Sequence, residues 1–496
     1  MYPDSENIMN KITSPLLSSM KKSQARTTNG CVTNSTSGSF LVDFFFECGA
    51  MRLRSDEDIV MSFSKAFEED PTYAMRILFW ARDVRGGLGE RRLFNVIIKH
   101  IAINKPEVLK GSLQLIPEYG RWDDLLTLFE TNLEDDALSL IHENLSKSGG
   151  TNPLCAKWMP REKSSKRSLA KKIINKLGIS PKAYRKLLSE GTSVVENKMC
   201  SNDWNSIDYD KVPSVAMKNY TKAFIRHSPD LFKAYIDDVS AGKRKINSSV
   251  LYPHDIVTSM SGTLDLLEDG ERALSIRALE QQWAALPNWL MSNPHRILPV
   301  VDTSGSMLTG FGSIRPIDVS VSLGLYIAER NNGPFEDHFV TFSESPTLQS
   351  ISGDTLLERI NSVRTADWGY STNLESVFDL ILESAKRDSI LEEDMPNIIL
   401  VLSDMEFDSC SNNYNSDAIT CISRKYSDCG YKAPRVIFWN LNASGGNFPV
   451  TFDETGTALV SGFSPSILKQ LLSEGDISPV KIMREVVESD RYNFIK

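Results

Sequence analysis

Long apolar runs, paired cysteines and histidines are all scarce in this 496-residue sequence. No apolar run reaches the roughly 18 residues that a membrane-spanning helix requires, so we expect no membrane segment. The N-terminus has no basic region followed by an apolar one, so we expect no secretory signal and a cytoplasmic location. The seven cysteines are scattered and form no Cys-x-x-Cys pair, which favours reduced thiols over a zinc site or a disulfide framework.

The overall composition is that of an ordinary globular protein, with 41% hydrophobic and 24% charged residues. The length is too great for a single core, so two or three domains are expected. The net charge of -9 is unevenly spread, because residues 296–496 contain 16 Lys and Arg against 28 Asp and Glu. The residues before 296 are slightly basic, and this asymmetry indicates two domains with different partners.

One stretch, Ile297–Met307, combines an apolar run of strand length with a polar loop. The loop places the carboxylate of Asp302 close to the hydroxyls of Ser304 and Ser306. These are oxygen ligands, which suit a hard divalent cation such as Mg²⁺. In open α/β sheets, ligands collect at the carboxyl ends of strands, where this loop would lie. The alternative is a simple polar turn after a core strand.

Strand and helix patterns alternate from there to the C-terminus, which predicts a doubly wound, mainly parallel sheet. Pro316–Arg330 has a strictly alternating apolar pattern, but its length and the need for a crossover favour a buried helix. Two further loops at strand ends would join the first one. Thr372 lies just before a predicted helix, and Asp404 ends the predicted strand of residues 397–403.

Helix patterns dominate residues 39–293, which predicts an all-α domain of irregular helical repeats. Residues 1–38 are rich in Ser, Thr, Asn and Lys, and we interpret them as a flexible N-terminal segment. The break at Asn293-Pro294 places the boundary before a C-terminal α/β domain of residues 294–496.

Residues 157–186 form the most basic part of the chain, with eleven Lys and Arg against one acid, Glu162. Aromatic residues Tyr220, Phe224 and Tyr235 lie among further basic residues downstream. A basic surface with interleaved aromatics is what phosphate contact and base stacking require. The alternative is a solvated helix face. The candidate RNA-binding residues are Lys163, Lys166, Arg167, Lys171, Lys172, Lys176, Lys182, Arg185 and Lys186.

Several strings of residues resemble one family, the domain-of-unknown-function family 2828. They are residues 43–47 (DFFFE), 82–92 (RDVRGGLGERR), 211–217 (KVPSVAM) and 333–335 (GPF). That family in turn is similar to the Ro autoantigen, in which a TROVE module of HEAT-like helical repeats is closed by a von Willebrand factor A (vWA) domain. The resemblance implies a helical TROVE-like domain followed by a vWA-like domain.

The vWA resemblance also implies roles for the three loops as a metal-ion-dependent adhesion site. Ser304, Ser306 and Thr372 would contact Mg²⁺ or Mn²⁺ through their hydroxyls, and Asp302 and Asp404 would hold the cation partly through water. No glycine directly precedes Thr372, so either Ser371 or Thr372 could supply the hydroxyl.

The expected function is that of a monomeric, non-enzymatic scaffold of the ribonucleoprotein type that binds structured RNA. The metal site would bind an acidic side chain of a protein partner. One alternative is a metal-dependent protein-interaction module without RNA. Another is a metal-dependent hydrolase with Glu406 or Asp408 as general base, although the three loops contain no His.

Overall fold

The computed structural model describes most of the chain. The described residues are 24–146, 150–192, 194–262, 269–291, 293–308, 314–342, 346–366, 372–408, 418–443, 446–472 and 476–495. No helix within these ranges is both long enough and apolar enough to cross a bilayer. The six cysteines in the same ranges form no disulfide with one another.

The first half of the chain consists of short helices joined by tight turns. Several begin at a capping side chain followed by proline, as at Asp70-Pro71 and Ser180-Pro181, because the cap satisfies a free N–H and proline lacks one. The helices are α3 (Phe40–Glu47), α4 (Asp56–Glu69), α5 (Pro71–Arg82), α6 (Arg91–Asn104), α7 (Pro106–Lys110), α8 (Leu115–Tyr119), α9 (Glu134–Leu145), α10 (Pro153–Trp158), α11 (Arg167–Leu177), α12 (Pro181–Glu190), α13 (Val195–Cys200), α14 (Ser214–His227), α15 (Pro229–Ser240), α16 (Pro253–Gly262) and α17 (Asp269–Ala284).

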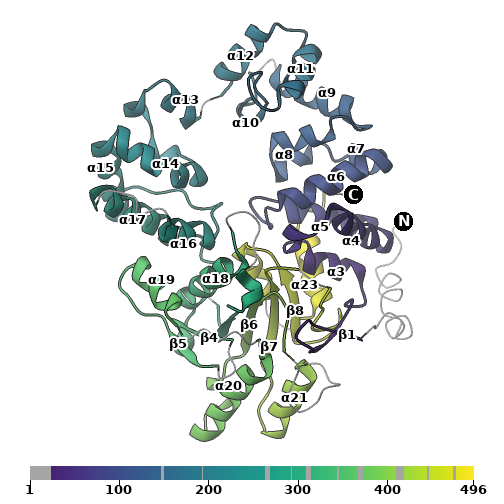
Figure 1. Cartoon of the computed structure of the whole chain (residues 1–496), viewed down its shortest axis with the longest axis vertical. Coiled ribbons are helices and arrows are strands. Elements are labelled where there is room, and N and C mark those ends of the chain that lie inside the picture. The colour runs from purple at the N-terminus through teal and green to yellow at the C-terminus, as the bar shows by residue number, and fades with distance from the viewer. Residues whose placement is uncertain are drawn as a thin grey trace.

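These helices trace an arc whose two ends both rest on the second half of the chain (Figure 1). The arc rises through α3–α9, crosses at α10–α12 and descends through α13–α17. At its start α3 packs against strand β8 (Thr457–Ser461), and at its end α16 packs against helix α18 (Pro316–Arg330). The C-terminal half therefore closes the circuit that the helices begin.

The C-terminal half is built on a six-stranded sheet. Its strands are β3 (Ile297–Val301), β4 (His338–Thr341), β5 (Leu348–Ser350), β6 (Ile398–Ser403), β7 (Arg435–Asn440) and β8. They lie in the order β5-β4-β3-β6-β7-β8, and all neighbours are parallel except β4 and β5. The remaining helices are α19 (Leu356–Arg364), α20 (Leu374–Asp388), α21 (Ala418–Asp428), α22 (Leu468–Leu471) and α23 (Pro479–Val487).

The strand order reverses between β3 and β6, which makes this pair the topological switch point where ligands bind in doubly wound sheets. Val301 pairs with Leu402 across the two strands. The loops that begin at Asp302 and Asp404 therefore leave the sheet side by side.

The alternating segment Pro316–Arg330 forms helix α18, as the crossover argument predicted. Eleven of its residues are buried, on nearly every side of the helix. Gly324 faces Val301 so closely that an added Cβ would lie 2.5 Å from its Cγ2. The alternation of apolar residues is thus a consequence of complete burial and not of a pleated strand.

The interpretation of residues 1–38 as a flexible segment is wrong from residue 24 onward. Strands β1 (Gln24–Arg26) and β2 (Val32–Asn34) form a hairpin, and Asn34 N–H donates to Phe448 O at 3.1 Å in the C-terminal half. This N-terminal hairpin packs on the sheet domain although it precedes the helical arc in sequence.

The string from Arg82 to Arg92 ties the arc together and to the C-terminus. Arg82 donates to Asp124 at 2.7 Å, and neither side chain is more than 2% exposed. The neighbouring Asp83 is fully buried and accepts hydrogen bonds from Arg491 at 2.8 Å and Tyr492 at 2.9 Å. Arg82 and Asp83 are therefore structural residues.

Apolar side chains form two separate cores. The large core runs without interruption from helices α3–α6 into the sheet, so the two halves of the chain share it. Among the described residues, a small second core belongs to α14, α15 and the preceding turns, with Phe224, Phe232 and Tyr235 at its centre, and Ala278 of α17 closes it. We call the part of the arc built on this second core (residues 204–246) the independent limb.

Candidate metal centre

Asp302, directly after β3, is the most buried carboxylate of the candidate site. Its side chain is 0% exposed. Oδ1 accepts from the backbone N–H of Ser304 at 2.9 Å, and Oδ2 accepts from the hydroxyl of Ser403 at 2.5 Å. The Ser304 and Ser306 hydroxyl oxygens lie 3.0 Å apart. The loop thus gathers one carboxylate and two hydroxyls, as its spacing predicts.

Asp404, directly after β6, contributes a second buried carboxylate. Its Oδ1 accepts from the backbone N–H of Glu406 at 3.2 Å, whereas its Oδ2 is buried and has no hydrogen-bond partner among the described residues. Met405 adopts a left-handed backbone conformation with φ of 68°, which costs free energy in a non-glycine residue. Such strain is typical of functional loops.

The two carboxylates lie close enough to repel each other. Burial, together with the neighbouring charge of Asp302, raises the pKa of Asp404 to about 7, although a hydrogen bond from the Ser306 hydroxyl lowers it. Burial also raises the pKa of Asp302, against hydrogen bonds from Ser403 and Ser304 that lower it. Each carboxylate is unfavourable as an anion in this protein environment, and a cation between them would offset that cost.

Thr372 makes its hydrogen bonds to residues 406 and 408, which follow Asp404 in the chain. Its backbone N–H donates to Asp408 Oδ2 at 2.8 Å, and its hydroxyl donates to Glu406 O at 2.6 Å. No hydrogen bond within the described ranges joins Thr372 to Asp302 or Asp404. The alternative hydroxyl, Ser371, lies outside the described residues. The structure therefore brings Asp302, Ser304, Ser306 and Asp404 together. It places Thr372 against residues 406–408.

Sequence reasoning missed a fourth element, the tip of the N-terminal hairpin. Asn29 Nδ2 donates to the Thr372 hydroxyl at 3.1 Å and to Glu406 O at 2.7 Å. The backbone N–H of Thr28 donates to Glu406 Oε2 at 2.8 Å. The Asn29-Gly30 dipeptide is a hairpin-turn signal that could have predicted the hairpin. It could not have predicted the contact, because the partners lie more than 340 residues away.

The donor set fits a hard cation better than zinc. The part of the chain that the structure describes contains no cluster of three or more His, Cys, Asp or Glu that could hold a metal. Two carboxylates with hydroxyls balance the charge of one divalent ion and leave coordination positions for water, as Mg²⁺ requires. The unpartnered Asp404 Oδ2 is the atom that such an ion would contact or hold through water.

The predicted basic surface lies on α11, α12 and the turn before them, at the top of the arc and far from the sheet (Figure 1). Three of its nine residues are paired with acids: Lys172 with Glu134 at 2.8 Å, Arg185 with Glu162, and Lys186 with Glu190. The other six are exposed and have no ion-pair partner among the described residues; they are Lys163, Lys166, Arg167, Lys171, Lys176 and Lys182.

The aromatic part of the RNA-binding prediction is wrong. Phe224 and Tyr235 are 0% and 1% exposed in the core of the independent limb, and Tyr220 packs against that core. Tyr184, within the basic stretch itself, is fully buried and donates to Pro160 O at 3.1 Å. The rings of Phe224, Tyr235 and Tyr184 cannot stack on a base, because each fills an apolar interior, and Tyr220 is half-buried against the same core.

Comparison with known proteins gives relatives of both halves. Uncharacterized protein L728 of Acanthamoeba polyphaga mimivirus is 29% identical over 512 residues, which cover 93% of this chain and 87% of that protein. The crystal structure of the Ro (RSR) protein of Deinococcus radiodurans is similar with a TM-score of 0.44 and 15% identity, over 91% of this chain and 93% of that one.

Two family descriptions match the two halves of the chain. Residues 296–493 match a domain of unknown function, DUF7788. Residues 27–176 and 154–293 match the domain of unknown function DUF2828, so this family covers more than half of the sequence and confirms the resemblance found from its motifs. The chain belongs to the DUF2828 family.

Proposed function

We propose that the chain is a non-enzymatic scaffold whose C-terminal half is a vWA-like domain with a divalent-cation site. Asp302 and Asp404, with Ser304 and Ser306, would hold Mg²⁺ or Mn²⁺. The bound ion would supply an open coordination position for an acidic group of a partner. The observation that carries this proposal is the buried, unpartnered Asp404 Oδ2 beside a second buried carboxylate.

The architecture supports the vWA-like assignment. The candidate ligands leave the carboxyl ends of the two strands at which the strand order reverses. Two hydroxyls and two carboxylates neutralise a divalent charge without excess, so the ion would keep its affinity for an additional anionic oxygen. We include Thr372 in the proposed site on the condition that its segment moves, since its hydroxyl now donates to Glu406 O.

Thermal unfolding with added cations tests this site. We expect Mg²⁺ or Mn²⁺ to raise the melting temperature, because a ligand at 100 times its Kd stabilises the fold by about 2.7 kcal/mol. Asp404→Asn should remove the response to cations, and the exposed control Asp428→Asn should keep it. A full response in Asp404→Asn, or none in the unaltered protein, would contradict the proposal.

Partner capture is the second arm of the same test. Addition of EDTA and the substitution Asp302→Asn should release the same acidic partner protein from a pull-down. Capture that survives both would show that the ion does not mediate binding.

Binding of structured RNA by the helical arc is the second proposed function. The six exposed and unpaired basic residues of α11, α12 and the turn before them support it. Because the nearby aromatic rings are buried, we expect phosphate contact without base stacking, and therefore little sequence preference.

Filter binding of short structured RNAs at several salt concentrations tests RNA binding. Each lost phosphate contact should reduce the slope of log affinity against log salt by about 0.7 to 0.9. Charge reversal of Lys166, Lys171 and Lys176 should flatten the slope, whereas reversal of the exposed Lys99 and Lys233 should not. An equal slope in both variants would contradict this function.

We propose no hydrolytic activity. The two candidate bases are held by structural hydrogen bonds, Glu406 by Thr28 and Asn447, and Asp408 by Thr372. A general base needs a free oxygen within reach of its substrate. Turnover with Mg²⁺ or Mn²⁺ that is lost in Asp404→Asn would contradict this view.

A further inference from the structure

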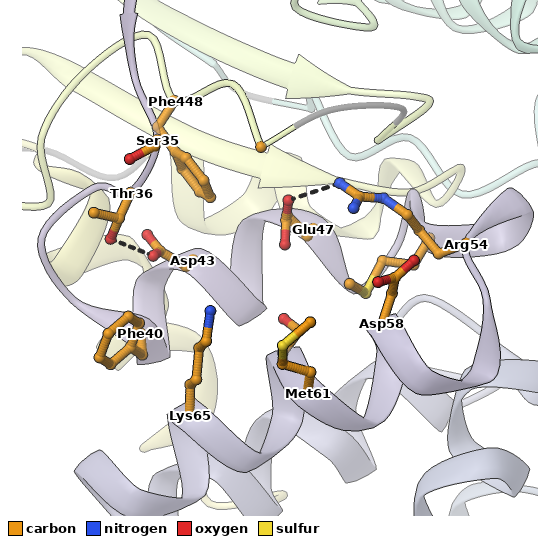
Figure 2. Close-up of a pocket in the computed structure, with 13 residues that line it drawn as sticks. Ser35, Thr36, Phe40, Asp43, Glu47, Arg54, Asp58, Met61, Lys65 and Phe448 are labelled. Carbon is orange, nitrogen blue, oxygen red and sulfur yellow. Dashed lines mark hydrogen bonds and ion pairs between the residues drawn. The ribbon is translucent and has the colours of Figure 1, made fainter. Parts of the chain in front are cut away.

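A pocket of about 300 Å³ lies between α3 and α4, and none of the candidate metal ligands lines it. Figure 2 shows the residues that line it. Helix α3 forms one wall with Phe40, Asp43 and Glu47, and α4 forms the other wall. Its volume is at the lower end of the range for small-molecule sites, which begins at about 300 Å³.

Glu47 supplies a buried carboxylate with one free oxygen. The residue is 9% exposed, and its Oε1 lies at a long 3.4 Å from Arg54 Nη2. Its Oε2 has no hydrogen-bond partner in the described structure, and the carboxylate projects toward the space between α3 and α4 (Figure 2). Arg54 is otherwise engaged, because its Nε donates to Ala443 O at 2.6 Å. A ligand donor could therefore satisfy Oε2.

Lys65 of α4 supplies the opposite charge. Its ammonium group points into the same space (Figure 2), and no ion pair holds it among the described residues. Lys65 Nζ lies over the face of the Phe40 ring, 5.8 Å from the ring centroid. The neighbouring Asp43 is already satisfied by Ser37 and Thr36, which donate to its two oxygens at 2.7 Å and 2.5 Å. Lys65 is thus free to bind an anionic group.

The pocket lining carries both signs of charge, with Asp43, Glu47 and Asp58 against Arg54 and Lys65. An anion alone would meet the carboxylate of Glu47, and a cation alone would leave Lys65 without a partner, so a ligand with both charges matches the lining best. Phe40, Met61 and Phe448 add apolar surface to the lining. Methionine and aromatic side chains adapt well to small apolar groups.

We propose that this pocket binds a small zwitterion of the α-amino-acid type. The ammonium group of the ligand contacts Glu47 Oε2, its carboxylate contacts Lys65 Nζ, and its side chain lies against Phe40 and Met61. Ser62 and Asp58 at the α4 wall offer further polar contacts to the ammonium group. Binding here is independent of the metal site and of RNA.

Calorimetric titration of the full-length protein with free amino acids tests the proposal, with L-leucine and L-phenylalanine as the first probes. We expect binding at concentrations below about 10 mM. N-acetyl-L-leucine lacks the ammonium group and L-leucine methyl ester lacks the carboxylate, so each should bind at least about tenfold more weakly, the value of one charged hydrogen bond.

Two single variants with matched controls assign the contacts. Glu47→Gln and Lys65→Met should each weaken binding about tenfold, while Glu57→Gln and Lys99→Met should leave it unchanged. Lys65 is exposed, so its variant should fold even if Glu47→Gln does not. The proposal is overturned if none of the twenty amino acids binds, if both blocked ligands bind as well as leucine, or if Lys65→Met binds as the unaltered protein does.

Discussion

Two acidic residues on one face of α3, Asp43 and Glu47, make the stability of the protein depend on pH. Burial raises the pKa of Asp43 to about 6 and that of Glu47 to about 7, from ordinary values of 3.8 and 4.5. The folded chain holds these protons more tightly than the unfolded chain. The stability that they contribute is therefore present at low pH and is lost as pH rises to about 7.

Glu47→Gln should remove about half of this loss, because glutamine does not ionise and Asp43 contributes a shift of similar size. At pH 4, below the ordinary pKa of Glu47, we expect the variant and the unaltered protein to have similar free energies of unfolding. At pH 8 we expect the variant to be more stable by up to about 3 kcal/mol, since each pKa unit corresponds to about 1.4 kcal/mol. Denaturant unfolding at both pH values measures this, with Glu57→Gln as control, and a pH-independent difference would contradict it.

The buried ion pair of Arg82 and Asp124 predicts a large effect from one substitution. Asp124→Ala would leave a guanidinium that is 2% exposed without its partner, at a cost of about 3–5 kcal/mol. Asp136→Ala removes an exposed pair with Lys110 and should cost about 1 kcal/mol or less. Denaturant midpoints of the two variants check the contrast, and similar losses would contradict the structural role of Arg82.

At the scale of elements, the N-terminal hairpin connects the loops of the metal centre. Asn29 holds both Thr372 and the backbone of Glu406, so the hairpin tip restrains two of the loops at once. Asn29→Ala should increase hydrogen exchange at residues 404–408 and reduce the rise in melting temperature that cations cause. Asn132→Ala, whose side chain donates to Ile103 O elsewhere, is the control. Unchanged exchange at residues 404–408 would show that the hairpin is a passive cover.

Some elements of the fold could be predicted from local sequence patterns, and others depend on contacts between distant parts of the chain. Strands β3 and β6 could be predicted with their terminal carboxylates, because an apolar run followed by Asp is a local pattern. Helix α18 could be predicted only from its length and crossover, since complete burial erased its helical period. The hairpin could not be placed, because Ser, Thr and Asn resemble a disordered composition when their partners are distant in sequence.

The same limit of local patterns applies to the predicted RNA-binding surface and to the α3–α4 pocket. The aromatic residues Phe224 and Tyr235 were assigned to a surface because their neighbours are basic, and the helix faces on which they lie turned them inward. Glu47 ends the string DFFFE, but that string does not point to Lys65, and the two side chains meet only because α3 and α4 pack against each other.

At the scale of the molecule, the two cores predict two levels of stability. The large core joins α3 to β7 although they lie in different halves, whereas α14 and α15 share a core of their own. We expect amides of α3 and β7 to exchange with one common free energy of opening. Amides of α14 and α15 should exchange together at a lower one. Hydrogen exchange with mass spectrometry measures this, and separate opening of α3 and β7 would contradict it.

The separate core of the independent limb has a mechanical consequence for the closed circuit of helices. This limb and the helix α17 that packs on it share an apolar interior of their own, so they can swing together as one rigid body, and nothing inside them needs to unfold. One stretch of the perimeter can thus part and rejoin while the shared core, the cation loops and the α3–α4 pocket keep their shape. A partner whose ends are blocked could then be admitted from the side.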